Sequence, residues 1–205
     1  DDGLDSRPLR LLDLGTGSGC ILITLLAELP SAEGTGTDMS AGALRLACEN
    51  ARTRGVGPRA RFVGADWFEG LTGRYDLIVA NPPYIPSGEI ASLSREVSGH
   101  DPLRALDGGA DGLSAYRRIA DRAGEFLMPG GHLLVEIGPT QADAVFELFR
   151  AAGLVIEEDG ILFDLAGRPR CIHAEAPFRG GAERRRTPKI SLENRDAQAS
   201  FKAAN

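Results

Sequence analysis

The stretch Leu9-Arg10-Leu11-Leu12-Asp13-Leu14-Gly15-Thr16-Gly17-Ser18-Gly19 decides the fold. Its first half is short and apolar, as in a buried strand, and its second half is a turn rich in glycine. Residues 20–29 then carry apolar side chains at helical spacing until Pro30 ends the helix. A strand, a glycine-rich loop and a helix in this order predict the first unit of a parallel α/β sheet.

The same alternation continues along the chain. Residues 32–37 should form the second strand, with Ser40 as the N-cap of a helix that reaches Arg54 and is closed by Gly55. Further strands are expected at 59–63, 75–80 and 132–138, and a helix at 113–127 with Ser114 as its N-cap. A turn is expected at Pro129-Gly130-Gly131.

The C-terminal part predicts a different strand arrangement. A last helix at 140–152 is followed by apolar residues 154–156 and by strands at 161–165 and 171–176, joined by a turn at 166–169. These two strands should form an antiparallel hairpin. We therefore predict an α/β fold: a mostly parallel sheet with helices on both faces, right-handed crossovers and a C-terminal antiparallel hairpin.

Composition limits the possible functions. The chain has 205 residues, enough for one catalytic-size domain, which we assign to residues 1–176, with a basic tail of low order at 177–205. A net charge of -6 argues against a surface built mainly to hold a phosphate backbone. No apolar run is long enough for a membrane span and the acidic start is no signal peptide, so we expect a cytoplasmic protein without membrane contact. The missing initiator Met is compatible with a cropped N-terminus.

Cysteine and histidine are sparse. Cys20, Cys48 and Cys171 are odd in number and lie in apolar segments, which predicts reduced, buried thiols. The histidines, at 100, 132 and 173, are too scattered in the sequence for a metal site, and we expect none. Glu136 is a charge within an apolar strand and should have a partner near the end of the sheet, either for structural pairing or for a role in substrate binding.

Polar residues gather where the predicted strands end. In a parallel sheet, ligands bind beyond the C-terminal strand ends, so these residues should line one pocket. The glycine loop allows a ligand to approach the backbone. A dinucleotide-binding fingerprint needs Gly or Ala at position 20, where this chain has Cys20. The loop also lacks the Gly-Lys-Ser/Thr ending of a phosphate-binding P-loop, which excludes that class. The candidate ligand-binding residues are Asp13, Gly15, Thr16, Gly17, Ser18, Gly19, Asp38, Asp66, Trp67 and Asn81.

Each acidic residue in this set has two interpretations. Asp38 can accept both hydroxyls of an adenosine ribose, or can act as a charge near the Ser40 cap. Asp13 either lies near the amino-acid end of a cofactor or holds the glycine loop. Asp66 can accept from the adenine amino group with Trp67 packed on the ring, although buried Trp is more often part of a core.

The motif Asn81-Pro82-Pro83-Tyr84 follows the apolar strand 75–80. Two consecutive prolines fix φ and remove two donors, so the loop presents carbonyl acceptors rigidly. The Asn81 side-chain oxygen and the Pro82 carbonyl can each accept one hydrogen of a planar NH2 group, with the Tyr84 ring against its flat face. We hypothesise that this catalytic motif aims a nitrogen lone pair at a sulfonium methyl group, without a strong general base.

Taken together, residues 13–19 and 81–84 resemble the amino-methylating branch of class I (Rossmann-like) methyltransferases, which act on glutamine amides, adenine N6 or cytosine N4. Within that branch, the chain from about Leu9 to Ala176 is similar to the bacterial peptide chain release factor glutamine methyltransferases, the PrmC or HemK family. The similar stretches outside the shared cofactor motifs are Asp101 to Gly109 with Asp111-Gly112-Leu113, Pro129 to Gly138, and Asp164 to Arg168.

The resemblance implies S-adenosyl-L-methionine as methyl donor, S-adenosyl-L-homocysteine as product, and release factors as protein substrates. Asn81, Pro82, Pro83 and Tyr84 would hold the glutamine of their Gly-Gly-Gln loop. Two departures are Asp101, where the family usually has Glu, and the absence of the family's N-terminal helical domain. A DNA or RNA amino-methyltransferase stays open as an alternative, although no basic, aromatic-interleaved stretch precedes residue 177 and nucleic acid is not the expected substrate.

Overall fold

A computed structural model describes residues 7–92 and 103–178. Its strands form a seven-stranded sheet in the order β3-β2-β1-β4-β5-β7-β6. The described residues divide into two compact units, 7–79 and 80–178, and each is treated by itself. Residues Asp101 and Pro102 and most of the predicted tail lie outside the described residues.

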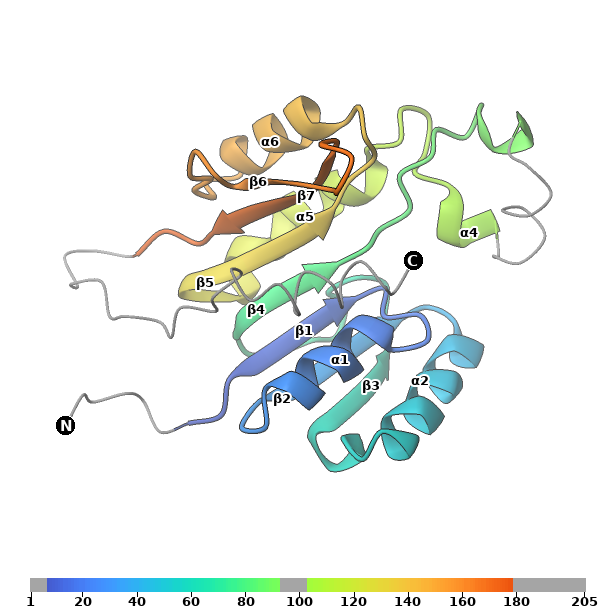
Figure 1. Cartoon of the computed structure of the whole chain (residues 1–205), viewed down its shortest axis with the longest axis vertical. Coiled ribbons are helices and arrows are strands. Elements are labelled where there is room, and N and C mark those ends of the chain that lie inside the picture. Colours follow the sequence, from blue (N-terminus) through green and yellow to red (C-terminus); the bar gives the residue numbers. More distant parts are fainter. Residues whose placement is uncertain (1–6, 93–102, 179–205) are drawn as a thin grey trace. The chain divides into compact units, whose positions relative to one another are not determined.

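The first unit alternates strands and helices as predicted (Figure 1). Its order is β1 (Arg10–Leu14), α1 (Cys20–Glu28), β2 (Glu33–Asp38), α2 (Ala41–Thr53), a 3-10 turn η1 (Gly57–Arg59), β3 (Ala60–Gly64) and β4 (Tyr75–Ala80), whose last residue opens the second unit. β1 pairs with β2, and β2 with β3, both in parallel, so that Leu14 is level with Thr37 and Asp38 with Gly64. The parallel pairing brings the C-terminal ends of these strands to one edge.

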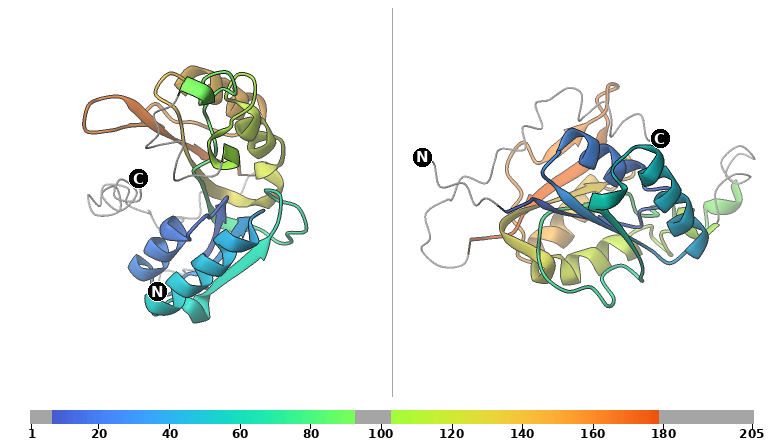
Figure 2. Two further views of the ribbon diagram at one scale, coloured as in Figure 1. Left: turned by 90° about the vertical axis from the view of Figure 1, so that its right-hand side faces the viewer. Right: turned by 90° about the horizontal axis from the view of Figure 1, so that it is seen from below.

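Glycines in β2 allow its close packing. A Cβ at Gly34 would come within 2.5 Å of the Leu22 side chain, and one at Gly36 within 2.9 Å of the Phe62 ring. Glycine weakens an isolated strand, but here it lets α1 sit directly on β2. α1 and α2 lie side by side against the strands of this unit (Figures 1 and 2).

The second unit contains the antiparallel part of the sheet. Its elements are a 3-10 turn η2 (Ile90–Ser92), α4 (Leu103–Leu106), α5 (Ser114–Phe126), β5 (Leu127–Glu136), α6 (Ala142–Ala151), β6 (Ile161–Phe163) and β7 (Pro169–Glu175). β7 runs antiparallel to both β5 and β6, which confirms the predicted C-terminal hairpin. α5 and α6 pack against each other (Figure 1).

Several local expectations are wrong. Residues Pro129-Gly130-Gly131 do not form a turn but belong to β5, because Gly130 N donates to Ala176 O at 3.0 Å and Ala176 N to Gly131 O at 2.9 Å. Ser114 is the first residue of α5 and not its cap, a position held by Leu113 without a side-chain hydrogen bond. The apolar residues 154–156, for which no strand was predicted, contribute one bridge, between Val155 and Glu175.

The α2 boundaries agree with the sequence. Ser40 accepts a hydrogen bond from Ala43 N at 3.2 Å, and Gly55 follows the helix with a φ of 74°.

The prediction of reduced, buried thiols is confirmed only in part. All three cysteines are free thiols, but Cys20 is exposed, Cys48 is half-buried and only Cys171 is buried. Among the described helices, none has the length and apolar character that a membrane span requires.

Asp76 in β4 anchors the start of β1 within the first unit. Its carboxylate accepts two hydrogen bonds from the Arg7 guanidinium, at 2.6 and 2.8 Å, and one from Arg10 N at 2.8 Å. Burial acts to raise the pKa of Asp76, but these hydrogen bonds and the charges of Arg7 and Arg10 outweigh burial and lower it. The ionised form therefore stabilises the fold.

We expect Asp76→Asn to lower the free energy of unfolding by about 2 kcal/mol at neutral pH. A pKa that is depressed in the folded state gives stability that is present above the unfolded value, about 3.9, and is lost as the pH falls through the folded value. The difference between wild type and variant should therefore shrink below about pH 4. Urea unfolding across a pH series measures it, with exposed Asp121→Asn as control, and a pH-independent difference would contradict the assignment.

Candidate functional site

The glycine-rich loop between β1 and α1 is built on backbone conformations that favour glycine. Gly15, Gly17 and Gly19 have φ values of 68°, 55° and 81°. A Cβ at Gly15 or Gly17 would meet nothing within 4 Å, so the space beside both backbones is open. A hydrogen bond to β2 fixes the loop, since Thr16 N donates to Thr37 O at 2.8 Å. A ligand can thus contact the loop backbone directly.

Asp13 is the buried carboxyl beneath this loop. It is 1% exposed and its Oδ2 accepts a hydrogen bond from the Thr16 hydroxyl at 2.6 Å. Burial raises the pKa of Asp13 to about 7, although the Thr16 hydrogen bond acts to lower it. Among the described residues no cation offsets this effect, and a buried carboxyl with so strongly raised a pKa is a candidate functional group.

Asp38 links the loop to the start of α2. Its Oδ2 accepts from Gly17 N at 2.9 Å and its Oδ1 from Ser40 N at 2.8 Å. Asp38 therefore holds the loop beside the helix N-terminus, and its contact with a ribose stays a prediction for a carboxylate that remains half-exposed. Each carboxylate oxygen keeps acceptor capacity for a ligand hydroxyl.

The segment after β3 lies next to Asp38, because Ala65 N donates to Asp38 O at 3.1 Å. Trp67 follows at a φ of 55°, and it is the sole non-glycine residue with positive φ within 7–92 and 103–178. Such strain is concentrated at functional sites. Trp67 and Asp66 are half-buried while Phe68 is buried, so Phe68 and not Trp67 supplies the core contact. All predicted ligand-binding residues of the first unit are thus brought together.

The Asn81–Tyr84 loop opens the second unit directly after β4. Pro82 is buried, whereas Asn81, Pro83 and Tyr84 are half-buried. Gln141 holds the loop: its Nε2 donates to Tyr84 O at 2.9 Å and to Gly112 O at 3.2 Å. Its Oε1 accepts from Gly138 N at 3.1 Å and lies 3.3 Å from the Tyr116 hydroxyl. One amide therefore uses both its ends to fix the loop.

The Asp107-Gly108-Gly109 stretch pairs with the residues that follow this loop. Ile85 N donates to Leu106 O at 3.1 Å and Gly108 N to Ile85 O at 2.8 Å. Ser87 N donates to Gly109 O at 2.8 Å, and the Ser87 hydroxyl donates to Asp107 at 2.6 Å. The stretch that sequence alone could only assign by resemblance is thus a strand-like support for the Asn81–Tyr84 loop.

Close backbone contacts explain the glycines near this support. A Cβ at Gly108 would lie 2.9 Å from the Tyr84 carbonyl carbon and 2.8 Å from Gly112 Cα. At Gly112, which has a φ of 74°, a Cβ would overlap the Tyr84 carbonyl oxygen. No side chain fits at either position without moving the loop.

Glu136 has the partner that the sequence predicts. Arg170 on β7 forms an ion pair with it at 3.1 Å, and Glu136 is 2% exposed. Burial acts to lower the pKa of Arg170, but Glu136 and Tyr84 outweigh it and raise it. The ion pair therefore lies near the Tyr84 side chain.

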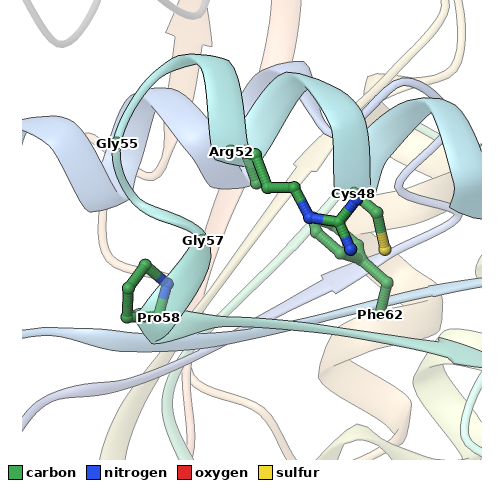
Figure 3. A pocket seen from close by; sticks show the side chains of 7 residues that line it. Cys48, Arg52, Gly55, Gly57, Pro58 and Phe62 are labelled. Carbon is green, nitrogen blue, oxygen red and sulfur yellow. The ribbon is translucent and has the colours of Figure 1, made fainter.

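A separate pocket lies in the first unit between the C-terminal half of α2 and β3 (Figure 3). It is lined by Cys48, Ala51, Arg52, Gly55, Gly57, Pro58 and Phe62. None of the predicted site residues lines it. It lies away from Asp38, which precedes the N-terminus of α2.

Sequence reasoning missed the residues that support the site from a distance. Gln141 and Arg170 each act on Tyr84, and Asn50 on α2 donates to Ser18 O at 2.9 Å. Gln141 could have been found from its position, because it follows the end of β5, where ligand-binding residues of such sheets lie. Arg170 carried none, because its partner Glu136 lies 34 positions earlier in the sequence.

Residues 3–94 match the family model of the methyltransferase small domain. The chain is 52% identical over 165 residues to the release factor glutamine methyltransferase of Rhodospirillum rubrum, covering 80% of this chain and 50% of that protein. The Bradyrhizobium diazoefficiens protein of the same name is 51% identical, with 80% and 55% covered. Among solved structures, a Pyrococcus furiosus methyltransferase aligns with a TM-score of 0.62 at 16% identity, covering 84% of this chain and 78% of that one.

The fold is that of the class I methyltransferases, as predicted. By sequence, the chain belongs to the family of release factor glutamine methyltransferases. It spans about half the length of these relatives.

We expect Gln141→Met to lower the free energy of unfolding by about 2 kcal/mol, because it leaves the buried backbone groups around Tyr84 without their partners. Thermal or urea unfolding measures this loss. Glu147→Met is the matched control, since Glu147 is exposed on α6, the helix whose N-cap position is Gln141. Equal stability of the two variants would show that the Gln141 amide does not hold the loop.

Proposed function

We propose that this chain carries the catalytic part of an S-adenosylmethionine-dependent enzyme that methylates the glutamine side-chain amide of the Gly-Gly-Gln motif in peptide chain release factors, in the cytoplasm. The observation that carries the proposal is the Asn81–Tyr84 loop, fixed by Gln141 and by pairing with Asp107 to Gly109. The identity of about 50% to release factor glutamine methyltransferases supports this choice of acceptor.

The first unit offers what the methyl donor requires. The donor supplies an electrophilic methyl group on a sulfonium sulfur, and after transfer it leaves as S-adenosylhomocysteine. Asp38 has acceptor capacity for the ribose hydroxyls, and the open backbone at Gly15 and Gly17 allows close approach. Asp66 and Trp67 are assigned to the adenine. Asp13, a buried carboxyl whose pKa is raised to about 7, is matched to the positive charge of the donor.

The second unit offers what the acceptor amide requires. Asn81 Oδ1 and Pro82 O each accept one N–H hydrogen of the glutamine amide. This holds the NH2 group rigidly and disfavours delocalisation of the nitrogen lone pair into the carbonyl. That pair forms the new N–C bond, the electrons of the breaking C–S bond remain on sulfur, and one N–H proton is lost to water. Alignment and matched electrostatics together supply several kcal/mol of barrier reduction, on the order of 5.

We expect methyl transfer from labelled donor to a purified release factor, and no transfer to the same factor with Gly-Gly-Gln changed to Gly-Gly-Ala. Asn81→Ala should lower transfer by at least about 100-fold, because one of two acceptors for the NH2 group is lost. It should leave the thermal shift caused by S-adenosylhomocysteine nearly unchanged.

Two controls separate the alternatives. Duplex and single-stranded DNA are offered in parallel, and label on DNA but not on the factor would contradict the assigned acceptor. Stabilisation by NAD but not by S-adenosylhomocysteine would contradict the donor. Undiminished turnover of Asn81→Ala would mean that the loop does not hold the amide.

We expect donor affinity to rise as the pH increases through about 7, the pKa of Asp13. The carboxyl is protonated below this pH and attracts a cation only when ionised above it. Donor binding at neutral pH should therefore release protons, because the bound positive charge lowers the pKa. Calorimetry in buffers of different ionisation enthalpy measures the release. Asp13→Asn should remove both effects, whereas Glu28→Gln, on the exposed end of α1, should retain them.

A further inference from the structure

His132, His173 and Glu175 form a cluster in the second unit that the sequence did not predict. His132 Nδ1 lies 3.0 Å from His173 Nε2 and 3.4 Å from Glu175 Oε1. His173 Nε2 lies 4.0 Å from the same carboxylate oxygen. The expectation that the histidines are scattered is therefore wrong for His132 and His173, while His100 lies outside the described residues.

Strand pairing brings these residues together. In the antiparallel register of β5 and β7, His132 is directly opposite Glu175, and Leu134 is opposite His173. Residues two apart on a strand share a face, so His173 lies on the same face as Glu175 and diagonal to His132. Two backbones that are already hydrogen bonded hold the three side chains in place.

The three donor atoms have the separations that a metal ion requires. Tetrahedral zinc with bond lengths of about 2.0–2.1 Å places its ligand atoms about 3.3 Å from one another. The observed separations of 3.0, 3.4 and 4.0 Å lie around that value. A shift of about half an ångström, within the freedom of side chains that are 16–31% exposed, would equalise them.

The ligand types select the class of metal. Two imidazoles and one carboxylate suit zinc and its first-row neighbours, and do not suit magnesium or calcium, which prefer oxygen ligands alone. Imidazole binds a metal in its neutral form, so zinc and protons compete for these two histidines.

We propose that His132, His173 and Glu175 bind one divalent transition-metal ion, zinc in the first instance, with water completing the coordination. The ion crosslinks β5 and β7 and stabilises the antiparallel part of the sheet. We assign it a structural role, because His132 lies four residues along β5, roughly 13 Å at strand spacing, from Glu136, whose partner Arg170 is near Tyr84. None of its ligands belongs to the proposed donor or amide sites.

The test uses the full 205-residue chain without a histidine tag, treated with a chelator and then dialysed. Calorimetric titration with zinc should give one site, and cobalt should give the intense visible absorption of a four-coordinate ion with nitrogen and oxygen ligands. At free zinc about 100 times the dissociation constant, the melting temperature should rise by about 5–10 °C. Magnesium at the same concentration should not change it.

Variants assign the ligands. His132→Asn, His173→Asn and Glu175→Gln should each weaken zinc binding by roughly 100-fold or more. His100→Asn, which changes the remaining histidine, and Glu158→Gln, which removes an exposed carboxylate in the same unit, are matched controls and should bind zinc as the wild type does. Circular dichroism without metal verifies that each variant is folded. If a histidine variant does not fold, Glu175→Gln still tests the site, because glutamine keeps the shape of the glutamate side chain.

Two results would overturn the proposal. One is the absence of a zinc-induced rise in melting temperature in the wild type. The other is zinc binding that survives all three substitutions, which would assign the ion to other groups such as the exposed Cys20 thiol. Blocking the thiols with iodoacetamide before titration distinguishes that case, since binding to the His132 cluster should persist.

Discussion

The proposed chemistry depends on how the backbone around Tyr84 is held. A planar NH2 group has two hydrogens in fixed directions, so its acceptors must be fixed as well. The prolines at 82 and 83 restrict φ, but a loop with two prolines has few donors with which to bond to its surroundings. The attachment is made instead through carbonyl oxygens and through the residues that follow, by Gln141 at Tyr84 O and by the Asp107 stretch at Ile85 and Ser87. A rigid loop therefore needs a second segment to bond to it.

Glycines in both units serve one of two purposes, close packing of the backbone or open space beside it. Backbone must approach backbone closely at Gly108 and Gly112, and a helix must approach a strand closely at Gly34. The glycine-rich loop differs, because Gly15 and Gly17 have open space where a Cβ would be. There, positive φ and not crowding requires glycine, and the open space remains for a ligand. One residue type thus serves packing in one place and access in another.

The sequence predicted most of the fold because its strongest signals are local. Apolar runs, the Ser40 cap and Gly55 each act over a few residues, and the structure confirms them. The Pro129-Gly130-Gly131 turn failed for a non-local reason: the chain after β7 supplies hydrogen-bond partners that keep these residues in a strand, against their local preference. The residues of the glycine loop, Asp38 and Asp66 were predicted from strand ends, and the structure brings them together. How they bind a donor stays a prediction.

What the sequence could not supply was pairing across strands. Arg170 with Glu136 and His132 with Glu175 are contacts set by the register of β5 and β7, and no spacing along the chain encodes that register. The hairpin was predicted, but its alignment with β5 was not. A slip of one residue would move every side chain of β7 to the opposite face, separating both pairs at once. The ion pair near Tyr84 and the histidine cluster therefore depend on the same register, so the antiparallel part of the sheet bears on the surroundings of the Asn81–Tyr84 loop and does not only cover the core.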